Sequence, residues 1–87
     1  MSDITRQIVA DKLAAYLRHD ISREQLVAWA EAAMMDGEFE RKHFADIRDV
    51  VARLGVADVR AFGLSWEDCE QLLGRLGYAA RVNIVAT

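Results

Sequence analysis

The segment from Ile21 to Gly37 carries both the start and the stop signals of a helix. Ser22 and Gln25 have the spacing of a capping box, in which each side chain satisfies the backbone N–H of the other residue. Ile21 and Leu26 stand where the accompanying hydrophobic staple places its two apolar residues. Gly37, which lacks a Cβ, is typical of a helix end in the left-handed conformation. We therefore predict a helix over this segment, with the rest of the chain packed around it.

At about 100° per residue, this helix presents two different faces. The face predicted to meet the core contains Leu26, Val27, Trp29, Ala30, Ala33 and Met34. The opposite face contains Glu24, Ala28, Glu31 and Met35. Methionine is over-represented at binding surfaces, so the apolar residues on the outer face either complete the core of a small domain or form part of an interface.

A first helix is predicted from Met1 to His19, with Ser2 or Asp3 as its N-cap, because no Gly or Pro interrupts the apolar stripe. The link to the next helix is short, covering only the residues from His19 to Ile21. A link of this length favours an antiparallel arrangement of the two helices that it joins.

A third helix is predicted from Arg41 to Leu54, where apolar residues recur on one arc. Gly55 ends it, and Val56 stands where a Schellman motif places its apolar contact. A fourth helix is predicted from Trp66 to Leu76. Its signals are a capping box of the residues Ser65 and Asp68 at the start and Gly77 at the end.

The clearest strand pattern in the chain runs from Tyr78 to Ala86, where apolar and polar residues largely alternate. A strand needs a partner for its backbone groups, and residues 57–62 are the candidate within one subunit. The alternative is that the C-terminal strand pairs with its copy across a dimer. We therefore predict an α+β fold, mostly α, with about four helices and a small C-terminal strand element, either a βαβ unit or a dimer-paired strand.

Composition narrows the classes of protein further. The chain has 87 residues, which suits a single small globular domain over residues 1–87. The net charge of −3 argues against a general nucleic-acid surface, because that surface is built from clustered Lys and Arg. With one cysteine, no signal-peptide pattern and no apolar run of membrane-spanning length, we expect a cytoplasmic protein that binds neither nucleic acid nor membrane.

Residues able to carry chemistry are few. Cys69 falls within the apolar arc of the fourth predicted helix, where a thiol is buried and inert. His19 and His43 have no neighbours at the spacing of a zinc site, and His43 falls on an apolar arc. The segment from Asp36 to Glu40 lacks the ligand spacing of a calcium loop. We predict no catalytic residue, no metal site, no cofactor and no enzymatic activity.

Charge is distributed unevenly along the chain. Between residues 24 and 40 there are five acids and no Lys or Arg, and the stretch from Ala61 to Gly74 has three acids and no base. Such stretches form either a solvated surface or an acidic docking face for a basic partner. The residues predicted to bind a partner are Glu24, Glu31, Met35, Glu38 and Glu40.

Three segments of the sequence resemble known proteins. The phrase AEAAMMDGEFERKHF, residues 30–44, resembles the helix-turn-helix phrase of tellurite-resistance TerB-like domains, with His43 where those domains have an acid. The phrase YLRHDISREQLVAWAE, together with LSWEDCEQLLGRLGY, resembles small bacterial proteins of unknown function, and the first is similar to helical immunity proteins and antitoxins. This resemblance implies an acidic helical domain that neutralises a basic toxic nuclease.

The sequence thus leads to two hypotheses. The first is a non-enzymatic protein-interaction module, immunity- or antitoxin-like, that binds a basic partner through its acidic surface. The second is a structural homo-oligomer assembled through the strand from Tyr78 to Ala86, because proteins usually cover an exposed strand edge.

Overall fold

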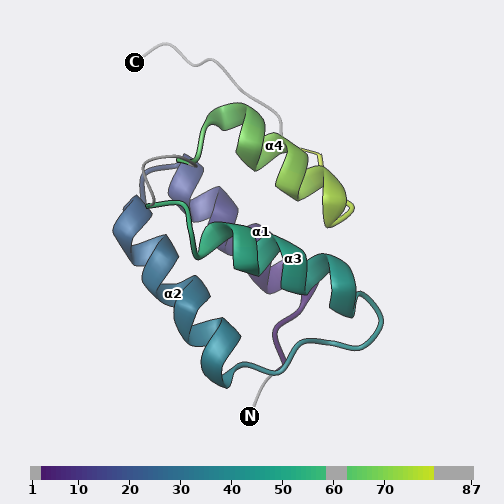
Figure 1. The fold of residues 1–87 in the computed structure, drawn as a ribbon. Coiled ribbons are helices and arrows are strands. Elements are labelled where there is room, and N and C mark those ends of the chain that lie inside the picture. Colours follow the sequence, from purple (N-terminus) through teal and green to yellow (C-terminus); the bar gives the residue numbers. More distant parts are fainter. Residues whose placement is uncertain (1–2, 59–62, 80–87) are drawn as a thin grey trace.

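The computed structural model describes residues 3–58 and 63–79 of the chain, and four helices make up its framework (Figure 1). In chain order these helices are α1 (Arg6–Leu17), α2 (Arg23–Asp36), α3 (Phe44–Leu54) and α4 (Trp66–Arg75). Over the described ranges, the other regular pairing is an isolated parallel bridge between Ile4 and Phe39. The prediction of a mostly helical fold with about four helices is therefore confirmed.

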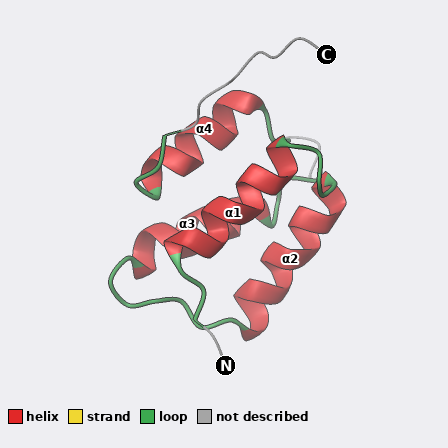
Figure 2. Cartoon of the chain, turned by 180° about the vertical axis from the view of Figure 1, so that it is seen from behind, coloured by secondary structure: helices red, strands yellow, loops and turns green. Residues whose placement is uncertain are grey.

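The helices α1 and α3 form the centre of the fold. Each of them contacts the other three helices, whereas no contact joins the described residues of α2 to those of α4. The views from both sides show α2 and α4 on opposite sides of the central pair (Figures 1 and 2). The predicted role of α2 as the element around which the chain packs is therefore wrong, because strong local signals fix a helix but not its place in the fold.

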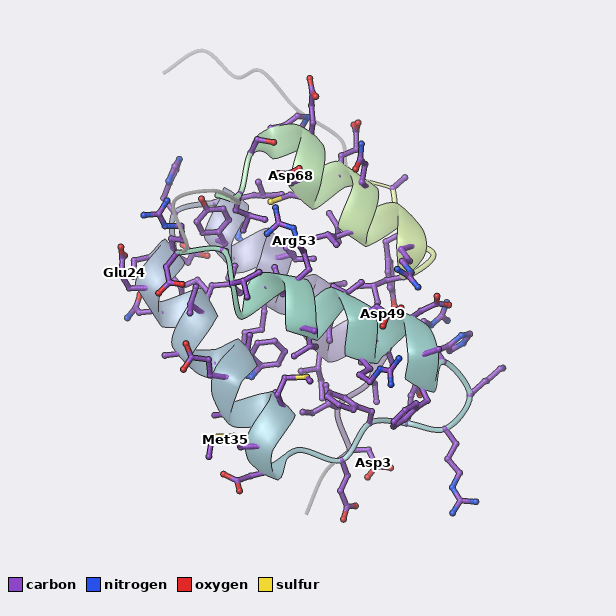
Figure 3. All side chains as sticks on the ribbon, viewed as in Figure 1. Asp3, Glu24, Met35, Asp49, Arg53 and Asp68 are labelled. Atoms are coloured by element: carbon purple, nitrogen blue, oxygen red, sulfur yellow. The ribbon has the colours of Figure 1, made fainter. Side chains whose placement is uncertain are left out.

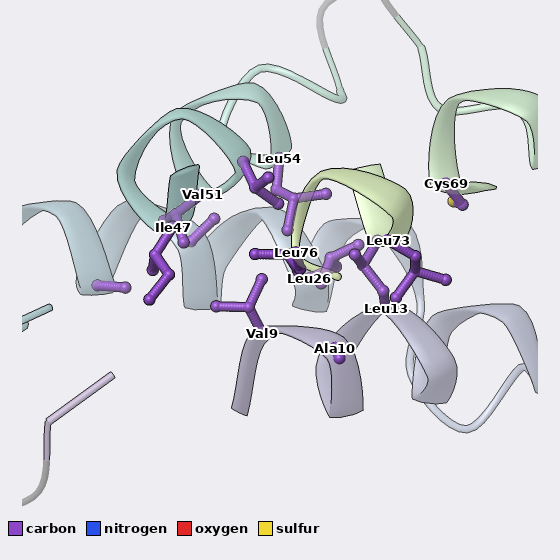
Figure 4. Close-up of a cluster of buried hydrophobic side chains, with 13 residues drawn as sticks. Val9, Ala10, Leu13, Leu26, Ile47, Val51, Leu54, Cys69, Leu73 and Leu76 are labelled. Atoms are coloured by element: carbon purple, nitrogen blue, oxygen red, sulfur yellow. The ribbon is translucent and has the colours of Figure 1, made fainter. Parts of the chain in front are cut away.

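One apolar core joins all four helices (Figure 4). Its buried members are Val9, Ala10, Leu13, Leu26, Ala30, Ala33, Ile47, Val50, Val51, Leu54, Cys69, Leu73 and Leu76. In the part of the chain that the structure describes, no polar or charged residue is buried. Removal of apolar side chains from water is thus the main force that holds the helices together.

The start of α1 differs from the prediction. Thr5, rather than Ser2 or Asp3, is the N-cap, and its hydroxyl accepts a hydrogen bond from the backbone N–H of Ile8 at 3.2 Å. The reason lies in the preceding residue, because Ile4 pairs with the segment after α2. Its N–H donates to the carbonyl of Glu38 at 2.6 Å, and its carbonyl accepts from the N–H of Glu40 at 3.1 Å. Extended pairing of Ile4 excludes a helical conformation there.

Gly37 ends α2 as predicted, but not in the left-handed conformation. Its backbone is extended, with φ −78° and ψ 153°. The lack of a side chain matters for another reason, since a Cβ at this position would clash with Cδ1 of Ile4 and lie 2.6 Å from the carbonyl oxygen of Ala33. The glycine therefore lets the N-terminal segment pass close to the end of α2.

The bounds of α3 are also partly wrong in the prediction. The helix begins at Phe44 rather than Arg41, and His43 is its N-cap. At the other end, Gly55 keeps right-handed helical angles, with φ −64° and ψ −17°, so the predicted Schellman motif does not form. The chain instead continues into a further turn, in which the N–H of Ala57 donates to the carbonyl of Leu54 at 3.1 Å.

The predicted signals of α4 are confirmed at both ends. Ser65 and Asp68 form a complete capping box. Gly77 has a φ of 91°, in the left-handed region that favours glycine. The N–H of Tyr78 donates to the carbonyl of Leu73 at 2.9 Å, and the N–H of Gly77 to that of Gly74 at 3.1 Å, which is the Schellman pattern.

Most of the predicted strand element lies outside the described residues. This applies to residues 59–62 and 80–86. The parts that are described, residues 57–58 and 78–79, are not in strand conformation. The small strand element, in either of its forms, therefore stays a prediction.

Candidate interaction surface on α2

The outer face of α2 brings together three of the predicted partner-binding residues. Glu24, Glu31 and Met35 are all exposed, and their spacing of seven and four residues places them on one side of the helix. Figure 3 labels Glu24 and Met35 at the two ends of this side. Met35 is 82% exposed, far more than the other exposed large apolar side chains of the described residues. Ala28 lies between the two acids and is also exposed. We call Glu24, Ala28, Glu31 and Met35 the outer face of α2.

The inner side of the same helix explains why these residues face outward. Leu26, Val27, Ala30 and Ala33 are buried. Because a helix has 3.6 residues per turn, burial of this stripe turns the residues at the intervening positions toward solvent. The capping box fixes the start of the helix, since Gln25 accepts from the N–H of Ser22 at 2.8 Å and the Ser22 hydroxyl accepts from the N–H of Gln25 at 3.1 Å.

The remaining two predicted residues lie beyond α2, and the structure separates them. Glu38 is exposed, in the segment that pairs with Ile4. Glu40 is half-buried, and its carboxylate accepts a hydrogen bond from the backbone N–H of Arg6 at 3.2 Å. Arg6 is the first residue of α1, where a negative charge is stabilised by the helix dipole. Glu40 therefore caps α1 instead of joining the outer face of α2.

The acids of the α2 region have few cationic neighbours. Glu24 reaches Arg23 only at 4.0 Å. For Glu31, Asp36 and Glu38, the described parts of the chain provide no ion pair within 4.0 Å. These carboxylates are therefore solvated, and the fold does not depend on their charge.

Acids near α4 have a different environment. The carboxylate of Asp68 accepts from the N–H of Ser65 at 2.9 Å and lies 3.5 Å from the guanidinium of Arg53. The hydrogen bonds from the backbone and hydroxyl of Ser65 hold the pKa of Asp68 below its ordinary value, and Arg53 acts in the same direction. Arg75 pairs with Asp46 at 3.1 Å and with Asp49 at 2.6 Å. These acids connect α4 to α3, which sequence reasoning missed because the pairs join distant positions.

The residues considered for chemistry lie in three different parts of the fold. Cys69 is fully buried, as predicted, and burial raises the pKa of its thiol to about 11, with a further contribution from Asp68. His43 is half-buried at the N-cap of α3 and makes no capping bond, and His19 is exposed in the turn after α1. Across residues 3–58 and 63–79, no three His, Cys, Asp or Glu residues are grouped so that they could hold a metal ion.

A surface depression of about 520 Å³ lies at the turn between α1 and α2. Its lining includes Tyr16, His19, Asp20, Arg23 and Glu24. Sequence reasoning did not predict this depression. His19, one of its lining residues, has a left-handed backbone with a φ of 65°. Charges of both signs line the depression, so it does not select one class of ligand.

None of the four described helices combines the length and apolar character needed to cross a bilayer. Comparison of the chain with protein-family models, with curated proteins and with solved structures finds no match.

Proposed function

We propose that this chain is a non-enzymatic protein-interaction module that binds a protein partner through the outer face of α2. The observation that carries the proposal is Met35, which is 82% exposed on a helix whose inner side already fills the core. Transfer of such a side chain from water to an interface is favourable, and methionine adapts its shape to a partner. Little of the Met35 side chain is buried in the core, so its apolar surface is available for binding.

The charges beside Met35 support a basic partner. Glu24 and Glu31 are exposed on the same face, and the chain carries a net charge of −3. Complementary charge speeds association and disfavours partners of the wrong sign. An immunity- or antitoxin-like role, in which the module neutralises a basic toxic protein, is the specific form of the function that we propose, and a reducing cytoplasm suits its single cysteine.

Affinity capture with matched variants tests the proposal. The tagged wild-type chain and the variants Glu24→Lys/Glu31→Lys and Met35→Asp are used to capture proteins from the lysate of the source cell. The control Glu67→Lys/Glu70→Lys makes the same charge change at two exposed residues of α4. We expect the wild type and the control to retain a common protein that the α2 variants lose. Retention that is unchanged in the α2 variants, or no retained protein at all, contradicts the proposal.

The second candidate function is a structural homo-oligomer assembled through the strand predicted from Tyr78 to Ala86. Its support is the alternation of apolar and polar residues in that segment. The same pattern also suits a βαβ unit with residues 57–62, which would leave the chain monomeric. Light scattering at micromolar concentration separates the two, because the oligomer requires at least twice the mass of one chain. A monomer contradicts the assembly.

A further inference from the structure

The outer side of α2 has the residue spacing of a helix-packing seam. Gln25, Ala28, Ala32 and Met35 follow one another at intervals of three, four and three residues, which are the intervals of the a and d positions of a heptad. All four residues are exposed. The inner side of α2 is already packed against the core, so this outer seam is a second packing surface of the same helix without an occupant among the described residues.

Side-chain size at the seam favours a helix as the occupant. Ala28 and Ala32 are one turn apart and small, so another helix can approach the α2 backbone to the short end of the usual interaxial range, about 8 Å. Gln25 is held by the capping box, through the 2.8 Å bond from the N–H of Ser22, and does not block the approach. Met35, at the C-terminal end of the seam, is unbranched and can fill the space between two helices.

The charged residues along the seam determine which sign of charge a bound helix must carry. Glu24 and Glu31 lie along one edge, at the heptad position g. On the other edge Asp36 is exposed, and Lys12 of α1 lies 5.7 Å from the ring of Trp29. Because both g positions of α2 are glutamates, the edge formed by Glu24 and Glu31 is acidic. A helix with Lys or Arg along its flank complements this edge.

A second copy of the chain fits this seam poorly. An antiparallel copy of α2 places the edge of Glu24 and Glu31 against the same edge of its partner. A parallel copy places Glu31 near Asp36 of the other chain, since g and the following e position face each other. Both arrangements bring like charges together, which is unfavourable, so the occupant is not a copy of this chain.

We infer that the occupant is a basic amphipathic helix of another protein, which packs along α2 over Ala28, Ala32 and Met35 and pairs its Lys or Arg side chains with Glu24 and Glu31. This inference rests on the proposed function and adds the class of partner structure and its place on α2. Recognition of this kind uses an apolar stripe for affinity and flanking charges for the choice of partner.

Peptide binding tests the inference directly. The probe is a fluorescent peptide of three heptads with Leu at a and d and Lys at e and g, and its binding to the full chain is followed by anisotropy. Two control peptides are used, one with Glu at e and g and one with the basic composition in scrambled order. We expect saturable binding of the basic amphipathic peptide alone. Binding of the scrambled basic peptide with equal affinity, or tighter binding of the acidic peptide, overturns the inference.

Variants of the chain place the peptide on the seam. Ala28→Gln/Ala32→Gln fills the seam with residues that keep helix propensity, and we expect about tenfold weaker binding with an unchanged circular dichroism spectrum. Glu24→Gln/Glu31→Gln should weaken binding by a similar factor at low salt and less at high salt. The control Glu67→Gln/Glu70→Gln should leave binding unchanged. Unchanged binding by the alanine variant overturns the inference.

The same variants separate this inference from the proposed function. A protein captured from lysate that depends on Met35 but not on Ala28 and Ala32 supports the module and overturns the helical seam. Capture that is indifferent to all α2 variants contradicts the proposed function itself. Sedimentation showing a dimer that the alanine variant dissociates assigns the seam to a second copy, and it also overturns the inference.

Discussion

The helices α2 and α4 flank the central pair α1 and α3 on opposite sides, and both begin with a capping box. Their attachment to the rest of the fold differs. On α2 the buried residues are Leu26, Val27, Ala30 and Ala33. Within α4 the buried residues are Cys69 and Leu73, and charged side chains from other helices add to the attachment. The same local start signal therefore leads to two different modes of packing.

Arginine side chains make the difference at α4. Arg75 pairs with Asp46 and Asp49 of α3. Arg53 of α3 donates to the carbonyl of Gly63 at 3.0 Å, and Arg6 of α1 donates to the carbonyl of Leu76 at 3.2 Å. Acids near α4 thus take part in holding the fold together, whereas Glu24 and Glu31 on α2 do not. Charge that the fold does not use is available for a partner, and this contrast leads to four predictions.

The largest effect is expected on the inner side of α2. Leu26 is fully buried, so Leu26→Ala should lower the free energy of unfolding by about 2–5 kcal/mol, through lost apolar contact and the cavity left behind. Met35→Ala is the matched control on the outer side and should change it by less than about 0.5 kcal/mol. Urea denaturation measures both. A large loss in the Met35 variant would show that the outer side also supports the fold.

Alanine substitution at two glycines should change the stability of the fold in opposite directions. In Gly37→Ala the new Cβ meets Ile4 and the backbone of Ala33, so we expect a loss of about 1–3 kcal/mol. In Gly74→Ala the new Cβ meets nothing within 4 Å in the last turn of α4, so better helix propensity should add up to about 1 kcal/mol. Thermal midpoints of the two variants check the signs. Shifts of the two midpoints in the same direction would contradict the close approach of Ile4 to Gly37.

Acid should weaken the fold through Asp68. The native pKa of this carboxyl is lowered, chiefly by the hydrogen bond from the backbone of Ser65, so its contribution is full above the ordinary value of 3.8. The contribution is lost as pH falls through the lower native pKa. Urea midpoints measured between neutral pH and pH 2 should fall less steeply with acid in Asp68→Asn than in the wild type. Parallel acid profiles would contradict this role.

The smallest effect on stability is expected at the acids of the outer face. Glu24→Gln/Glu31→Gln should change the free energy of unfolding by less than about 0.5 kcal/mol, because neither charge has a close partner that the fold needs. The same double variant is the one expected to weaken peptide binding. Stability and binding measured on one preparation show whether the two properties are separable, as the comparison of α2 with α4 requires.

The features of this fold that the sequence could predict are those that residues close together in the chain determine. Ser22 with Gln25, Ser65 with Asp68, and Gly77 act within a few residues, and the structure contains all three features. The outer position of Met35 also follows from helical periodicity, and its exposure agrees. These features depend on neighbouring residues alone, so one sequence is sufficient to predict them.

The features that the sequence did not reveal depend on distant residues. The start of α1 at Arg6, the extended conformation of Gly37 and the cap formed by Glu40 all follow from the pairing of Ile4 with the segment after α2. Nothing near Ile4 in the sequence indicates that pairing. For the candidate site, periodicity predicted the outer face of α2, but only the packed fold shows that Glu40 is engaged elsewhere.

The pairing of Ile4 with Phe39 also bears on the order in which the chain folds. Arg6 and Glu40, which bond beside it, are 34 positions apart, so closing this loop costs chain entropy before the contacts compensate for it. The helices α2 and α3 follow each other in sequence and share the most extensive contact, so they can associate early. We therefore expect the N-terminal segment to pair with the segment after α2 only once α2 and α3 have packed together.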